Sequence, residues 1–205
     1  MKWIKKEWTQ CISFYKNEIH KPTLITGIVF FAIGILIWVV LAMNEDVLMQ
    51  SYHWLMSIFE EKGMDMESIT VLDLFKNNAT ACLYGVITGF IPFFYMDAFS
   101  LVVNVASIGI IGAIYSYQHL SMLLLAAGLI PHGIFELPAI FISLAMGFKT
   151  CHLMTLRITG KIKNLDMKAH SINLVRIFVW IVLPLLIIAA IVEAHITPII
   201  MNLFM

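Results

Sequence analysis

The amino-acid sequence predicts an all-α protein, a helical bundle of about five transmembrane helices, and two observations support this class. Hydrophobic residues make up 60% of the 205-residue chain and charged residues only 13%, whereas about 25% of the residues of an average soluble domain are charged. Long apolar runs also recur along the chain. A soluble domain of this size has too little interior for so many apolar side chains, so we expect lipid to cover many of them.

Five runs are long and apolar enough to be expected spans. The first contains no charged residue, and its roughly 20 residues suffice for a helix to cross a bilayer. Because it lacks a small-residue cleavage site, we interpret it as a retained anchor. We see no internal repeat, which predicts one transmembrane domain. The five expected spans are 24–43, 77–96, 98–118, 120–148 and 177–195.

The distribution of Lys and Arg predicts the orientation. These residues concentrate in segments 1–23 and 149–176, and cytoplasmic flanks of membrane helices are enriched in them. The connection 44–76 instead has seven acidic residues against two lysines. We therefore expect a multi-pass protein of the bacterial cell membrane with a cytoplasmic N-terminus and an extracytoplasmic C-terminus. The net charge of zero gives no reason to expect nucleic acid as a partner.

Three segments outside the spans have expected structures. Residues 1–23 form an amphipathic segment that suits either a helix on the inner leaflet or one packed on the protein itself. Segment 44–76 contains an amphipathic helix that covers the outer mouth of the bundle or binds a partner. We expect a basic cytoplasmic loop over 149–176. The apolar stripe in 44–76 consists of Val47, Leu48, Ser51, Trp54, Leu55, Ile58 and Phe59.

The fourth expected span should be kinked or broken. It has 29 residues, more than a straight crossing needs. Pro131 and Pro138 each lack an N–H group, so each leaves a helical carbonyl without its partner, and Gly133 lies between them. Carbonyls freed at membrane depth must face protein or water. The sequence therefore predicts an organised polar break in this helix.

His132 and Glu136 lie in the same stretch, four residues apart, on one helical face. Ionisable residues at the bilayer centre are costly and usually point to a pathway or site. In an enzyme this pair would be catalytic. Alternatively, a neutral Glu136 bonds His132 or a neighbouring helix and stabilises the bundle. Candidate neighbours in the polar interior, each also suited to interhelical hydrogen bonding, are Asn77, Asn78, Thr88 and Asn104.

No cofactor is expected from the sequence, although zinc at His132 and Glu136 stays open. The pair lacks the second histidine of the His-Glu-x-x-His motif, and a catalytic zinc commonly takes three protein ligands. Another helix would have to bring the third ligand. Cys11, Cys82 and Cys151 have no paired spacing, so we expect neither a disulfide nor a cysteine zinc site.

Several strings in this sequence resemble the stage II sporulation protein M family, whose members are bacterial multispanning membrane proteins. The most specific is Pro-His-Gly-Ile-Phe-Glu-Leu-Pro-Ala at 131–139. The likeness is good over residues 70–148, although Val105 stands where the family often has glycine. The other matching residues are Leu74, Phe75, Lys76, Asn77, Asn78, Ala79, Gly85, Gly89, Asn104 and Gly147.

The resemblance implies three contexts: forespore engulfment beside cell-wall hydrolases, membrane complexes with ATPase or transporter components, and maturation, secretion or immunity of circular bacteriocins. Our first hypothesis is an accessory or scaffold component that assists partner proteins in the membrane. The second is an intramembrane peptidase or peptide-maturation enzyme that uses His132 and Glu136. The third is a permease-like transporter subunit with the broken helix along its path.

Overall fold

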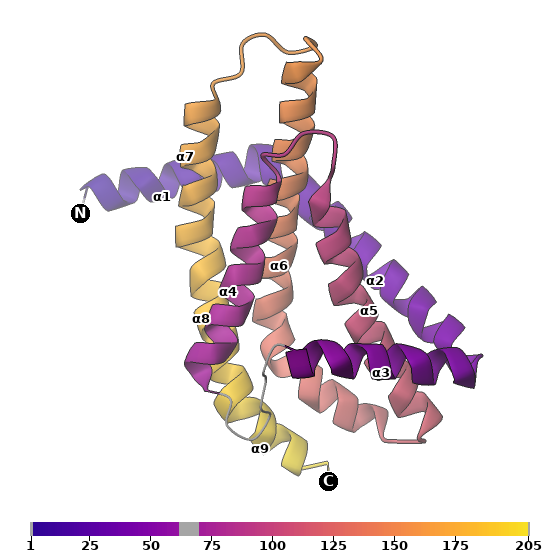
Figure 1. Ribbon diagram of the computed structural model, residues 1–205. Helices are drawn as coiled ribbons and strands as arrows, with labels where there is room; N and C mark the ends of the chain where they lie inside the picture. The colour runs from indigo at the N-terminus through magenta and orange to yellow at the C-terminus, as the bar shows by residue number, and fades with distance from the viewer. Residues whose placement is uncertain (1, 62–69, 205) are drawn as a thin grey trace.

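A computed structural model of the protein describes residues 2–61 and 70–204, and the regular structure of this part is helical throughout (Figure 1). Three π-helical turns, η1 to η3, join helices without a break. The elements are α1 Lys2–Phe14, η1 Tyr15–Ile19, α2 His20–Ala42, α3 Glu45–Glu61, α4 Val71–Thr88, α5 Met96–Tyr117, α6 Met122–Ile158, α7 Met167–Ile177, η2 Phe178–Val182, α8 Leu183–Ile191, η3 Val192–Ile196 and α9 Thr197–Asn202.

The predicted all-α membrane bundle is confirmed. Four continuous helices of the described chain are long and apolar enough to cross a membrane, namely Lys2–Ala42, Met96–Tyr117, Met122–Ile158 and Met167–Asn202. Many apolar side chains on their outer faces are exposed, as expected where lipid is the solvent; Ile28 on α2 is 70% exposed.

Helix α4 makes the fifth pass between the two ends of the bundle (Figure 1). It is shorter and more polar than the span expected at 77–96, and it ends at Thr88. The residues that follow form the turn to α5, where Pro92 has no N–H group to continue a helix. The first turn of α4 is closed by a capping box between Thr70 and Asp73.

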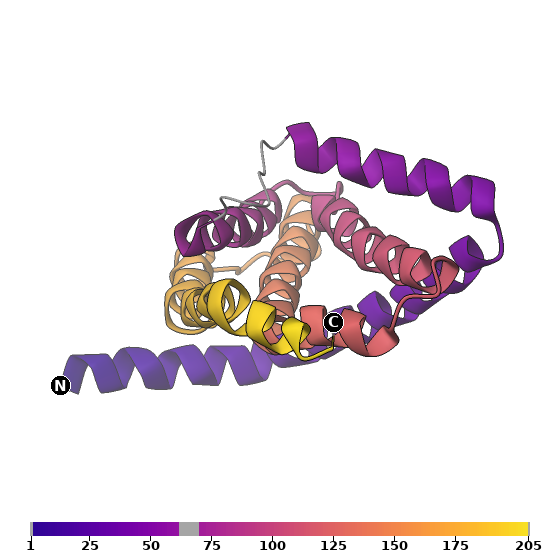
Figure 2. The same cartoon turned by 90° about the horizontal axis from the view of Figure 1, so that it is seen from below.

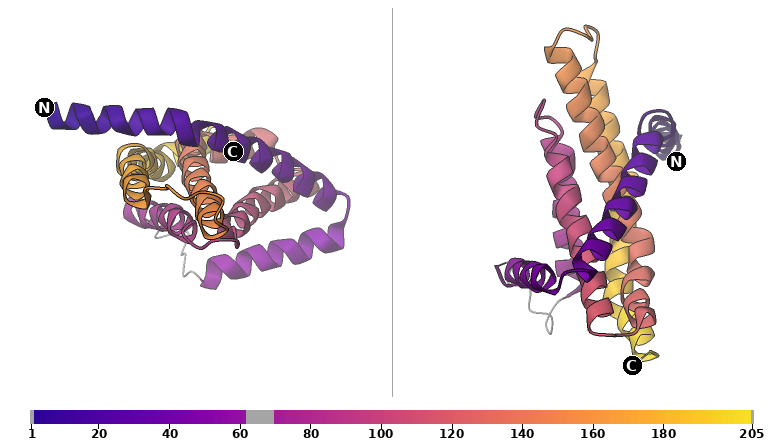
Figure 3. Two further views of the ribbon diagram at one scale, coloured as in Figure 1. Left: turned by 90° about the horizontal axis from the view of Figure 1, so that it is seen from above. Right: turned by 90° about the vertical axis from the view of Figure 1, so that its right-hand side faces the viewer.

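The two Lys- and Arg-rich segments lie toward the same end of the bundle, as predicted. Helix α1 and the α6–α7 connection lie in this half, whereas α3 and the C-terminus lie in the other (Figures 1 and 3). The basic loop expected over 149–176 needs correction, because α6 continues to Ile158 and α7 begins at Met167. Only residues 159–166 connect them, since Lys and Arg are good helix formers and a helix can extend beyond the bilayer.

The amphipathic N-terminal segment packs on the protein itself. Arg176 of α7 donates to both carboxylate oxygens of Glu7, with Nε 2.6 Å from Oε2. Trp8 lies edge-on to Trp180, and Cys11 is fully buried. Trp3 is still 67% exposed on the same helix. One face of α1 therefore packs against α7 and the residues that follow it, and another face exposes apolar side chains.

Helix α6 is the central element of the bundle. Seen along its length, it has α4 and α8 on one side and α2 and α5 on the other (Figure 2). Helix α6 passes very close to the end of α4. A Cβ atom added to Gly89, directly after α4, would lie 2.5 Å from the carbonyl oxygen of Gly147 in α6. Small residues at such a crossing let two helices approach closely.

Helix α6 is kinked rather than broken. The helix is continuous through Pro131 and Pro138, and Figure 1 shows its N-terminal part running obliquely to the rest. A proline in a helix removes one backbone hydrogen bond and pushes the preceding turn away, which bends the axis. The bend turns the first part of α6 under the bundle, toward the C-terminal helix.

Candidate functional site

Three ionisable side chains converge where the bent part of α6 meets the end of the C-terminal helix. His132 and Glu136 come from α6, and Glu193 comes from η3. One possible ligand atom from each lies within 4.8 Å of the other two. We call these three residues, with the adjacent Thr197 of α9, the polar centre.

The contacts within the polar centre orient the His132 ring. Its Nδ1 lies 3.4 Å from Oγ1 of Thr197, and its Nε2 lies 3.9 Å from Oε2 of Glu136. The side chains of His132 and Glu136 are 14% and 19% exposed. The centre is thus partly shielded yet reachable, and Nε2 faces the Glu136 carboxylate.

The local sequence explains why the C-terminal helix can present Glu193 here. Residues Val192–Ile196 form a π-helical turn directly before α9, and Pro198 occupies its first turn. Since Pro198 cannot donate to the carbonyl four residues earlier, the helix widens at this point. Such π-bulges are frequent at functional sites. The bulge sets the direction in which Glu193 leaves the helix.

The chemistry of this arrangement follows from its charges. Two carboxylates held close together away from bulk water repel each other, and an ionised residue at membrane depth costs at least about 2.5 kcal/mol. A proton shared between the carboxylates, or a cation bound by both, removes this cost. The polar centre is therefore built to hold a proton or a cation, and its carboxyl and imidazole groups can act as general acid and base.

The other predicted polar residues bond elsewhere. Nδ2 of Asn77 lies 3.3 Å from Oδ1 of Asn78 near the start of α4. Asn104 donates to the Ser100 carbonyl of its own helix, and Thr88 donates to the carbonyls of Tyr84 and Gly85. Asn77 and Asn78 thus bond each other, and Thr88 and Asn104 bond carbonyls of their own helices, so the structure does not bring these side chains into the polar centre.

Glu193, Thr197 and Asp97 are functional candidates that the sequence patterns above do not predict. Glu193 and Thr197 have the same four-residue spacing as His132 and Glu136, which could have drawn attention to them. Asp97 is 1% exposed, and neither of its carboxylate oxygens has a hydrogen-bond partner among the described residues. It packs on Gly147 beside the α4–α6 crossing. The sequence feature that could have identified Asp97 is its position between two apolar runs, 77–96 and 98–118.

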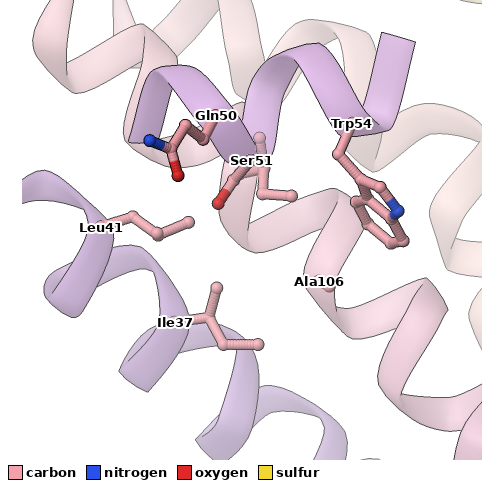
Figure 4. Close-up of a pocket in the computed structure, with 7 residues that line it drawn as sticks. Ile37, Leu41, Gln50, Ser51, Trp54 and Ala106 are labelled. Atoms are coloured by element: carbon pink, nitrogen blue, oxygen red, sulfur yellow. The ribbon is translucent and has the colours of Figure 1, made fainter. Parts of the chain in front are cut away.

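A groove with a volume of about 340 Å³ lies between α2, α3 and α5 (Figure 4). Its walls are apolar side chains of α2 and α5, while the α3 side offers two polar groups, Gln50 and Ser51. We call it the α3 groove. Its lining residues are Ile37, Leu41, Gln50, Ser51, Trp54, Ala106 and Ile110.

Comparison with known proteins agrees with the resemblance seen in the sequence. The chain is 30% identical over 121 residues to an uncharacterized protein of Methanocaldococcus jannaschii, an alignment that covers 59% of this chain and 67% of the relative. No solved structure matches. The model of the family described as Stage II sporulation protein M matches residues 27–198. On this match, which includes the polar centre and most of the bundle, the chain belongs to the Stage II sporulation protein M family.

Proposed function

We propose that this protein is an accessory component of a membrane complex of the cell envelope, and that it docks a partner protein at the α3 groove. The observation that carries the proposal is an amphipathic helix, α3, that lies across one end of the bundle (Figure 2). Part of its apolar surface is exposed. The family's name favours a sporulation context over a bacteriocin context.

Helix α3 is anchored on one face only. Leu48 and Leu55 are 1% and 2% exposed and pack with α2 and α5. Trp54, Val47 and Met56 are 46%, 44% and 38% exposed on the same helix. Exposed aromatic and apolar side chains beside a groove are typical of protein interfaces. Helix α3 is therefore held on the bundle by one face and exposes other apolar side chains that suit a partner.

The charge of this region indicates which partner fits. Asp46, Gln50 and Trp54 follow one another at four-residue intervals on α3, so an acidic and an aromatic side chain flank the polar rim of the groove. The whole connection 44–76 has seven acidic residues against two lysines. A partner helix with an apolar face and a basic flank complements this surface.

The test is photo-crosslinking in living cells from a reactive residue placed at Trp54. We expect a discrete adduct with a protein whose segment on the same side of the membrane is basic, identified by mass spectrometry. Asp46→Lys should reduce the adduct at least tenfold, because it reverses the charge beside the groove. Asp46 is exposed, so the bundle should stay folded.

Lys163→Glu is the matched control, since it reverses one charge in the α6–α7 connection at the other end of the bundle. It should leave the adduct unchanged. Adducts with lipid alone, an adduct between two copies of this chain, or equal crosslinking in Asp46→Lys would each contradict the proposal.

A second candidate function is an intramembrane peptidase or peptide-maturation enzyme. The observation that favours it is the arrival of Glu193 beside His132 and Glu136, which gives the centre the three ionisable groups that general acid-base chemistry or a catalytic metal would need. Glu136→Gln separates the two candidates, because it removes the acid and keeps the size of the side chain. Full cellular activity in Glu136→Gln supports the accessory role.

A further inference from the structure

We propose that the polar centre binds one divalent transition-metal ion, Zn²⁺, through Nε2 of His132 and one carboxylate oxygen each of Glu136 and Glu193. This inference goes beyond the proposed docking function and does not depend on it. Helix α6 supplies two ligands and the C-terminal helix supplies the third.

The donor set fits zinc by its chemistry. Zn²⁺ binds histidine nitrogen and carboxylate oxygen, and a site with three protein ligands and one open position is the usual catalytic or exchangeable form. Mg²⁺ and Ca²⁺ prefer sites made only of oxygen ligands, whereas imidazole favours zinc and its transition-metal neighbours. One imidazole with two carboxylates therefore selects this class of ion.

The distances fit after a small closure of the side chains. The three ligand atoms lie within 4.8 Å of one another, and Nε2 of His132 is already 3.9 Å from Oε2 of Glu136. Tetrahedral zinc with bonds of roughly 2.0–2.2 Å places its ligand atoms about 3.3–3.6 Å apart. Rotation of the flexible Glu136 and Glu193 side chains can supply the difference without moving either helix.

Thr197 supplies the outer contact that a metal-binding histidine requires. Its Oγ1 lies 3.4 Å from Nδ1 of His132. A proton held on Nδ1 by this contact leaves the Nε2 lone pair free for the metal, and such outer partners fix the tautomer and direction of the ring. The two helices thus supply three ligands and the group that orients one of them.

Charge balance favours a divalent ion at this depth. Two ionised carboxylates and a neutral imidazole carry a charge of −2, which one Zn²⁺ cancels. The filled centre is then neutral, as a site between membrane helices requires. A monovalent ion would leave one negative charge uncompensated.

The experiment uses the full chain purified in detergent, stripped with a chelator and titrated with Zn²⁺ against a competing indicator. We expect one ion per chain. Glu136→Gln and Glu193→Gln should each weaken binding at least 100-fold, because each removes a ligand. Thr197→Val should weaken it roughly 10–100-fold, as outer-contact losses do. Co²⁺ in the unmutated protein should give the visible absorption of a tetrahedral site.

Matched controls are Glu45→Gln and His119→Asn, which change one acid and one histidine that do not belong to the polar centre. Asn tolerates the positive φ of 54° at position 119, and Gln can still accept the hydrogen bond from Tyr117. Both should bind as the unmutated chain does. A stoichiometry below about 0.1 ion per chain, tenfold less than the single site expected, would overturn the proposal. So would a Glu193→Gln variant that binds Zn²⁺ as tightly as the unmutated protein. The Co²⁺ spectrum decides the matter if the ligand variants fail to fold.

Discussion

Gly147 and Asp97 pack tightly against each other beside the crossing of α4 and α6. A Cβ atom on Gly147 would lie 2.5 Å from Cγ of Asp97, and the Asp97 carboxyl group is buried. The resemblance singled out Gly147 for its position in a string, whereas the structure gives the reason: α4 and α6 meet here, and an acid occupies the remaining space. No larger residue fits unless the Asp97 side chain or a helix moves.

We therefore predict that Gly147→Ala lowers the free energy of unfolding by about 1–3 kcal/mol, because the added methyl group must displace Asp97 or separate the helices. Gly133→Ala is the matched control in the same helix, since its Cβ would meet only Leu137, at 3.9 Å. This control should be neutral or slightly stabilising, as alanine favours helix. Thermal unfolding of both variants in detergent measures the difference. Equal stabilities would contradict the crowding argument.

The kinked α6 and the π-bulged C-terminal helix work together at the element scale. The kink at the prolines turns His132 and Glu136 toward η3, and the bulge before Pro198 sends Glu193 to meet them. Each distortion has a local chemical cause, the missing N–H of a proline. The polar centre thus depends on two local distortions of the helical backbone, one in α6 and one in the C-terminal helix.

Replacing Pro138 by Ala should restore the hydrogen bond to the Ile134 carbonyl and straighten α6. We expect the distance between spin labels at Leu123 and Ile158, both exposed, to increase by a few ångströms toward the roughly 50 Å of a straight helix. Pro184→Ala, in α8, is the control and should leave this distance unchanged. If Pro138→Ala also leaves it unchanged, Pro138 does not cause the bend.

The distribution of charge organises the whole molecule. Both basic segments lie toward one end, while α3 and the C-terminus lie toward the other (Figure 3). Cytoplasmic segments of membrane proteins are enriched in Lys and Arg, so the end with the basic segments would be cytoplasmic. The α3 groove would then lie outside the cell. The α3 groove and the polar centre would then both lie in the outer half of the bundle.

Cysteine labelling with a membrane-impermeant reagent tests this orientation. A cysteine at position 46 should be labelled in intact cells, and one at position 163 only after lysis, because Asp46 is on α3 and Lys163 is in the basic connection. The native cysteines are buried, so they should add little background. The reverse pattern would show that the orientation is wrong.

The sequence by itself determined the fold class, the amphipathic helices and the pairing of His132 with Glu136. These features depend on composition and on contacts within one helix, where spacing fixes which side chains are neighbours. The charge count that oriented the connection 44–76 includes Lys62, Asp65 and Glu67, which lie outside the described residues.

Only the tertiary structure decided that Glu193 and Thr197 complete the centre, that Asp97 fills the α4–α6 crossing and that α3 leaves a groove. His132 and Thr197 are 65 residues apart in the chain. Their contact depends on a bend in one helix and a bulge in another, and helical periodicity within a single segment carries no information about how two distant segments meet.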